Sequence, residues 1–94
     1  MITLVRIHPV PPLFVNGAED GMFERASSDD PRTAARHYAY EHGVEVGGSV
    51  WIGWGQLPAT HEDYDFDLAH MEEWIVTRTY ATDRIPDVKQ GKTA

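Results

Sequence analysis

Acidic side chains gather in one segment of this 94-residue chain, residues 61–73. The segment holds six carboxylates and neither Lys nor Arg, so it carries −6 of the formal net charge of −7. Its acidic residues are Glu62, Asp63, Asp65, Asp67, Glu72 and Glu73. Such a run is typical of a solvated segment whose charges prevent sheet-to-sheet association. The alternative is a docking surface for a partner with a basic surface.

Aromatic rings alternate with carboxylates within this segment, in the order Asp63, Tyr64, Asp65, Phe66 and Asp67. Spaced carboxylates with stacking rings between them would imitate the phosphate row and the bases of a nucleic acid. The pattern therefore predicts that these five residues bind a partner. That partner is either a basic protein or, as a second hypothesis, a nucleic-acid-binding protein whose site the chain blocks.

The same spacing resembles the first ligands of a calcium loop, but the rest of that motif is missing. Counted from Asp63, the sixth position is Leu68 and the twelfth is Trp74, where an EF-hand needs Gly and Glu. At most an adventitious, low-affinity divalent site remains. The five histidines form no HExxH or His-x-His pattern. We therefore predict no metal site and no cofactor.

The sequence contains no motif typical of nucleophilic catalysis and only weak candidates for acid–base catalysis. There is no cysteine, and no serine lies in Gly-x-Ser-x-Gly. No glycine pattern matches a phosphate-binding loop. We expect no catalytic residue. A small enzyme using His37, His42 or His61 together with a carboxylate, such as Glu41, is the third hypothesis, and it needs a concave pocket around that pair.

The clearest element is a helix over about residues 30–42. Asp30 is a good N-cap, Pro31 suits the first helical position, and Gly43 suits the C-terminal cap. Ser28 is the alternative cap. One stripe of the helix is expected to face a sheet, and it consists of Ala34, Ala35, Tyr38, Ala39 and His42.

Alternating β-branched and aromatic residues predict strands at 2–8, 49–54 and 73–81, with a brief strand or a loop plug at 13–15. Residues 63–69 fit a strand, and 65–73 a short helix. The strands at 49–54 and 73–81 should pair antiparallel. The expected fold is α+β, a small antiparallel sheet of three to four strands with one helix on one face. Residues 1–85 form the single domain, and the polar residues 86–94 a flexible tail.

One helix covers one face of such a sheet, so the other face must be polar or meet a partner. In a regular strand Trp51 and Trp54 point to opposite faces. One of them is then expected on the uncovered face as an anchor for a partner. An exposed edge strand would also allow a homodimer.

Charge argues against direct nucleic-acid binding, because eight basic residues stand against fifteen acidic ones. No window reaches the length of a membrane span, and the first nine residues lack the pattern of a secretory signal. We expect a cytoplasmic protein that does not bind membranes.

The capped helix followed by Gly-Ser-Val-Trp-Ile and later by Glu-Trp-Ile-Val-Thr-Arg-Thr resembles, in style, small orphan proteins encoded by bacteriophages of high-GC hosts. The resemblance covers about residues 22–82 and implies a host-cell cytoplasm. It transfers no site residue. The leading hypothesis is a non-enzymatic interaction module of phage or mobile-element type that binds a host or phage protein.

Overall fold

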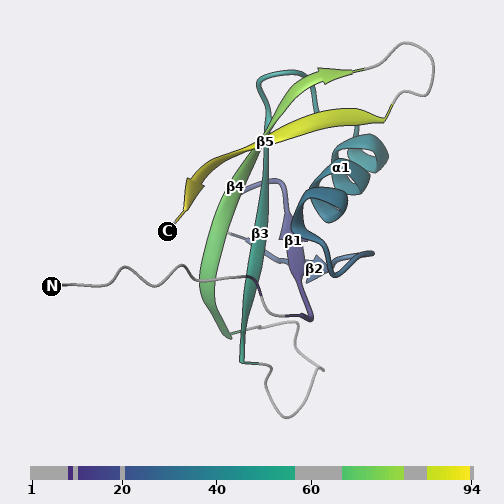
Figure 1. Cartoon of the computed structure of the whole chain (residues 1–94). Coiled ribbons are helices and arrows are strands. Elements are labelled where there is room, and N and C mark those ends of the chain that lie inside the picture. Colours follow the sequence, from purple (N-terminus) through teal and green to yellow (C-terminus); the bar gives the residue numbers. More distant parts are fainter. Residues whose placement is uncertain (1–8, 10, 20, 57–66, 80–84, 94) are drawn as a thin grey trace, which may run out of the picture.

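One helix and five strands make up the fold seen in the computed structural model, which describes residues 9, 11–19, 21–56, 67–79 and 85–93 (Figure 1). In chain order these elements are β1 (Phe14–Asn16), β2 (Glu24–Arg25), α1 (Pro31–His42), β3 (Ser49–Gln56), β4 (Asp67–Thr79) and β5 (Pro86–Thr93). The strands form one sheet in the order β2-β1-β3-β4-β5, and each pairing is antiparallel. The α+β prediction is confirmed, with one or two strands more than expected.

The helix α1 begins and ends where the sequence predicts. Asp30 is the N-cap, because its side chain accepts hydrogen bonds from the backbone N–H of Thr33 at 3.0 Å and from the Thr33 hydroxyl at 2.7 Å. The alternative cap, Ser28, instead accepts from the backbone N–H of Asp30. Gly43 ends the helix with φ 62° and ψ 38°, a left-handed conformation that favours glycine.

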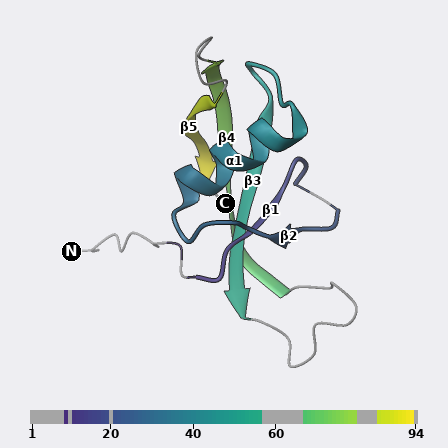
Figure 2. The ribbon, with the colours of Figure 1, turned by 90° about the vertical axis from the view of Figure 1, so that its right-hand side faces the viewer.

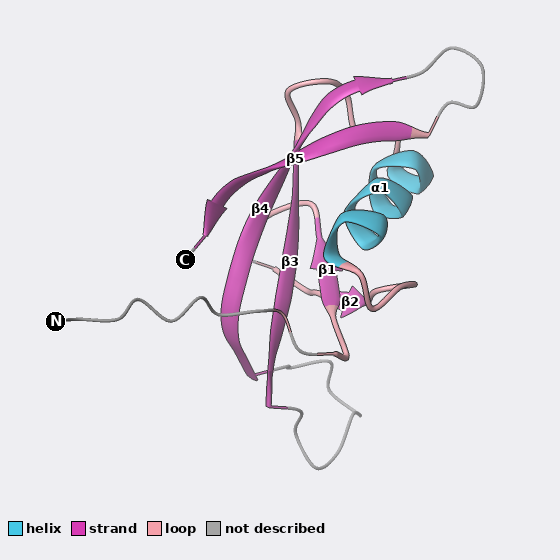
Figure 3. Ribbon diagram, in the orientation of Figure 1, coloured by secondary structure: helices cyan, strands magenta, loops and turns pink. Residues whose placement is uncertain are grey.

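The strands β3 and β4 pair from Ser49 opposite Ile75 to Gln56 opposite Asp67. Alternation along β3 directs Val50, Ile52 and Trp54 to the side covered by α1, where all three are buried. Figures 2 and 3 show α1 lying across this side of the sheet. The register shifts between Trp54 and Gly55, one residue beyond the glycine at which the sequence suggests a bulge.

The core lies between α1 and the sheet. Small residues on the helix, Ala34, Ala35 and Ala39, let it approach the strands closely. Of the predicted stripe, Tyr38 is half-buried, whereas His42 is exposed beyond the edge of the core. The other buried residues of this core come from β1, β3, β4 and β5 and from the residue before β1. They are Leu13, Val15, Val50, Ile52, Trp54, Val76 and Val88.

The structure corrects the predicted tail. Residues Pro86–Thr93 are the edge strand β5, paired with β4. The segment reads as polar because an edge strand needs few buried residues. Its Val88 is 4% exposed and closes the core opposite Val76. Pro86 occupies the first position of the strand, where a missing N–H is tolerated.

Other boundaries also differ. Residues 67–73 are strand, so the helix considered for 65–73 is wrong there, and β4 begins earlier than the predicted 73–81 strand. The sequence also misses β2, which is two residues long. The strand predicted at 2–8 lies outside the described residues.

Candidate functional site

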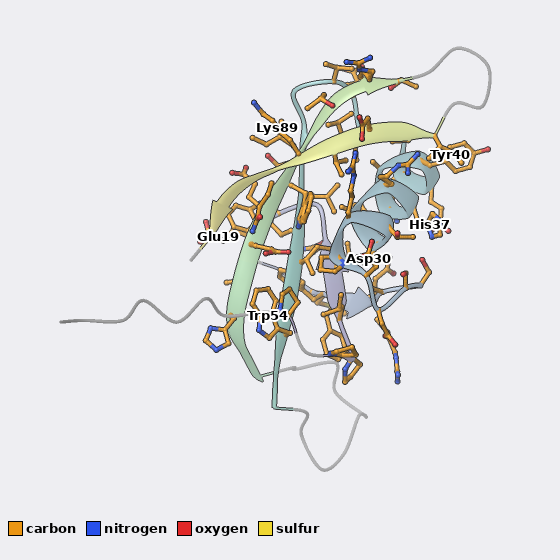
Figure 4. All side chains as sticks on the ribbon, in the orientation of Figure 1. Glu19, Asp30, His37, Tyr40, Trp54 and Lys89 are labelled. Carbon is orange, nitrogen blue, oxygen red and sulfur yellow. The ribbon has the colours of Figure 1, made fainter. Side chains whose placement is uncertain are left out.

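The two tryptophans proposed as anchors lie on opposite faces of the sheet, as predicted. Trp54 is 3% exposed and belongs to the core, where its ring stacks on His70 with centroids 5.5 Å apart (Figure 4). Trp51 lies on the other face and is partly exposed. Of the two, only Trp51 is partly open to solvent.

Most of the predicted acidic site, Asp63, Tyr64, Asp65 and Phe66, lies outside the described residues. Asp67 is the first residue of β4 and pairs with Gln56. The C-terminal part of the acidic segment is thus strand, and it runs directly into the sheet next to β3.

The sheet face away from α1 places partly exposed apolar and acidic side chains together. Asn16, Trp51 and Glu73 form one cross-strand row over β1, β3 and β4. Met71 and Ile75 flank Glu73 along β4, and all these side chains are partly exposed. We call these five residues the Trp51 face. It combines an aromatic side chain with the end of the acidic segment.

Glu73 is held in place within this face. The Ser49 hydroxyl donates a 2.5 Å hydrogen bond to its carboxylate. The neighbouring Gly91 on β5 lies close enough that an added Cβ would come within 3.0 Å of Ile75 and 3.3 Å of Glu73. The carboxylate is thus held in place opposite Trp51 in the neighbouring strand.

Glu72 lies on the opposite side of β4 from Glu73 and is only 3% exposed. One carboxylate oxygen accepts from the Trp74 indole N–H and the other from the Gln90 amide, both at 2.8 Å. This carboxylate links β4 to β5 and is withdrawn from the surface. The acidic segment therefore presents one carboxylate fewer at the surface than a count of its acidic residues suggests.

A groove of about 560 Å³, which was not predicted from the sequence, lies where α1 ends. Its walls come from the last turn of α1, the loop to β3, and the facing ends of β4 and β5. The described lining residues are Ala39, Tyr40, Glu41, Gly43, Val44, Glu45, Thr79 and Pro86. Only one wall of this groove has a signal in the local sequence, namely Tyr40 and Glu41 close to the helix-ending Gly43.

Two histidines of the helix, His37 and His42, have partners at the surface. His37 Nδ1 lies 3.0 Å from the Ser27 hydroxyl. His42 stacks on Tyr38 with centroids 4.1 Å apart, and its Nε2 lies 3.6 Å from a Glu24 oxygen. The hollow nearby, lined in part by Ser27, Glu24 and Glu41, has about 50 Å³. Substrate pockets usually have about 300–1,000 Å³, so this hollow has room for water but not for a substrate.

No cluster of three or more His, Asp or Glu arranged to hold a metal ion occurs within the described parts of the chain. Within the same residues, no helix is long and apolar enough to cross a membrane.

Two carboxylates and two arginines tie α1 to its surroundings. The Thr33 hydroxyl and backbone N–H hold the pKa of Asp30 below its ordinary value, and the Arg32 guanidinium does the same for Asp87. Arg32 meets Asp87 at 2.7 Å, and Arg36 donates to the Pro86 carbonyl at 2.9 Å. These arginines bind β5 and so serve the fold.

Comparisons with models of known protein families, with curated proteins and with solved structures find no match to this chain. The geometry of the molecule itself is therefore the basis for a functional conclusion.

Proposed function

We propose that the chain is a non-enzymatic, acidic protein-interaction module that binds a partner protein through a basic surface of that partner. The observation that supports the proposal best is the Trp51 face, which places a partly exposed Trp beside Met71, Ile75 and the fixed carboxylate of Glu73. Aromatic anchors with apolar neighbours are typical centres of protein interfaces. The helix packs against the other side of the sheet.

Charge selects the class of partner. Residues 61–73 carry most of the net charge of −7, and this segment leads into β4 at the Trp51 face. Such a local field accelerates encounter with a basic protein and disfavours acidic ones. In this proposal the acidic segment steers the partner and Trp51 anchors it.

The setting is proposed together with the function. The style of the sequence suggests a phage or mobile-element protein acting in the cytoplasm of a host cell. The absence of cysteine in the chain is compatible with a reducing compartment.

The test is capture of host-lysate proteins on the immobilised chain at about 0.05 and 0.15 M salt. Wild type is compared with Trp51→Ala and with Met22→Ala, a control that removes a side chain 72% exposed. We expect a protein retained by wild type and Met22→Ala but lost with Trp51→Ala. The proposal would be contradicted if Trp51→Ala retained the same proteins as wild type, or if no protein were retained specifically at either salt concentration.

Duplex DNA added to the same experiment separates the two kinds of partner. If the retained protein binds nucleic acid and DNA displaces it from the chain, the nucleic-acid mimic is supported. If DNA has no effect, the partner uses a surface other than a nucleic-acid site.

A further inference from the structure

The groove at the end of α1 is lined by none of the residues of the Trp51 face, so it raises a separate question. Its two carboxylates belong to Glu41, in the last turn of the helix, and Glu45, in the loop that follows. The described lining includes no Lys, Arg or His. The described part of the lining therefore favours a cation.

The backbone contributes in the same direction. A helix C-terminus carries partial negative charge from carbonyl groups that have no intrahelical partner. The cap at Gly43 satisfies two of these carbonyls, because Gly43 N–H donates to Tyr40 and Val44 N–H donates to Ala39. The negative end of α1 still lies at the groove, next to Glu41.

The nearest arginine on the helix does not cancel this charge by filling the groove. Arg36 directs its Nε–H to the carbonyl of Pro86 at 2.9 Å, on the side of the helix that packs against β5. Arg32, one turn earlier, is held by Asp87. Both cations are bound to the sheet edge and are not among the lining residues.

The rest of the lining is apolar or aromatic. Pro86 and Ala39 are buried, and Val44 is half-buried. The side chain of Tyr40 is 54% exposed and extends from the end of α1 next to the start of β5 (Figure 4). A ligand with an apolar stem and a flat cationic tip matches this combination.

We propose that this groove binds an arginine side chain presented by a basic segment of a protein partner. The aliphatic stem packs on Val44 and Pro86, the guanidinium stacks on the Tyr40 ring, and Glu41 and Glu45 accept its N–H groups. Guanidinium suits the site better than ammonium because its plane can stack on the ring while its edge donates hydrogen bonds.

The test uses defined peptides and needs no identified partner. The ¹⁵N-labelled chain is titrated with Ac-Gly-Arg-Gly-NH₂, and with peptides that carry Lys or neutral citrulline in place of Arg. Backbone amide shifts are expected at residues 40–45 and at Thr79, saturating in the millimolar range. Binding of the citrulline peptide should be about tenfold weaker, and the Lys peptide should bind more weakly than the Arg peptide.

Matched variants locate the site. Glu41→Gln combined with Glu45→Gln should weaken Arg-peptide binding about tenfold. Glu19→Gln, which removes an exposed carboxylate elsewhere, should leave binding unchanged. Circular dichroism confirms that each variant folds. Equal binding of the citrulline or Lys peptide, shifts that persist in the double variant, or no shifts at tens of millimolar peptide would overturn the assignment.

The groove and the Trp51 face can fail independently. Trp51→Ala should leave the peptide titration unchanged, whereas the double glutamine variant should leave Trp51-dependent capture from lysate in place. If only one of the two experiments gives the expected result, only the site tested by that experiment is supported.

Discussion

Individual side chains in this molecule divide between those that hold the fold and those that face outward. Asp30, Asp87 and Glu72 are acidic residues with firm intramolecular partners. Glu41, Glu45 and Glu73 lie at the groove or on the Trp51 face. The same residue type thus has opposite roles, and only the contacts distinguish them.

Asp30 should make the stability of the fold sensitive to acid. Its folded pKa lies below the ordinary value of 3.8, so its stabilising effect is complete above about pH 5 and is lost as the pH falls through the folded pKa. Asp30→Ala should lower the free energy of unfolding by about 1 kcal/mol at pH 7. Urea denaturation followed by circular dichroism measures this.

Asp30→Asn is the matched control, because it retains an acceptor for the helix cap but does not titrate. It should stay close to wild type at pH 7 and lose less stability between pH 5 and pH 3. Asp87, whose pKa is also lowered, keeps part of the acid dependence in this variant. An unchanged acid profile in Asp30→Asn would contradict the role given to the cap.

Adjacent glutamates on β4 offer a second comparison. Glu72→Ala should be destabilised by about 2 kcal/mol, because the buried carboxylate is the acceptor for the partly buried Trp74 indole and for the exposed Gln90 amide. Glu73→Ala removes the same charge but only the bond from Ser49, so about 1 kcal/mol is expected. Chemical denaturation of the two variants checks the order, and equal losses would contradict it.

At the scale of elements, much could be predicted from short-range signals. The cap at Asp30, Pro31 and Gly43 fixed the helix because each acts through local backbone geometry. The alternation of Val50, Ile52 and Trp54 fixed the buried side of β3 in the same way. The edge strand β5 was missed, because its pairing depends on β4, to which it is joined through residues 80–85, and local composition does not record that pairing.

The strand β5 also gives a test at this scale. Val88→Ala removes two buried methyl groups and should cost about 2 kcal/mol. Lys89→Ala, one residue along and exposed, should change stability by no more than about 0.5 kcal/mol. Thermal unfolding of the two variants separates a strand from a frayed tail, for which both changes would be silent.

The candidate site shows a similar limit. That Trp51 and Trp54 point to opposite faces followed from strand periodicity, but which of them is buried depends on where α1 packs. The groove was missed because it joins Tyr40 and Glu45 to Thr79 and Pro86 across the fold. Sites made of residues far apart in the sequence have no local signature.

The carboxylate of Glu41, which lines the groove, also affects the stability of helix α1. A carboxylate near a helix C-terminus is unfavourable, so Glu41→Gln should raise the free energy of unfolding by about 0.3–1 kcal/mol. Glu19→Gln, away from any helix end, serves as the reference. Urea midpoints of the two variants give the measurement, and a destabilised Glu41→Gln would show that this carboxylate supports the fold.

For the whole molecule, the net charge of −7 should make the folded state more stable as salt is added. Like charges about 10 Å apart repel by about 0.4 kcal/mol in water, and folding brings them closer than in the unfolded chain. Salt also weakens exposed ion pairs such as Arg32 with Asp87, but an exposed pair contributes only about 0–1 kcal/mol. The urea midpoint should therefore rise between about 0.02 and 0.5 M NaCl.

The combined variant Glu19→Gln, Glu41→Gln and Glu45→Gln reduces the negative charge and provides the control. Its midpoint should rise less steeply with NaCl than that of wild type, while the dependence of unfolding free energy on urea stays the same. A midpoint that falls with salt in the wild-type chain would mean that ion pairs outweigh repulsion in the fold. The carboxylates would then stabilise the fold through intramolecular ion pairs. They would not be available to bind a basic partner.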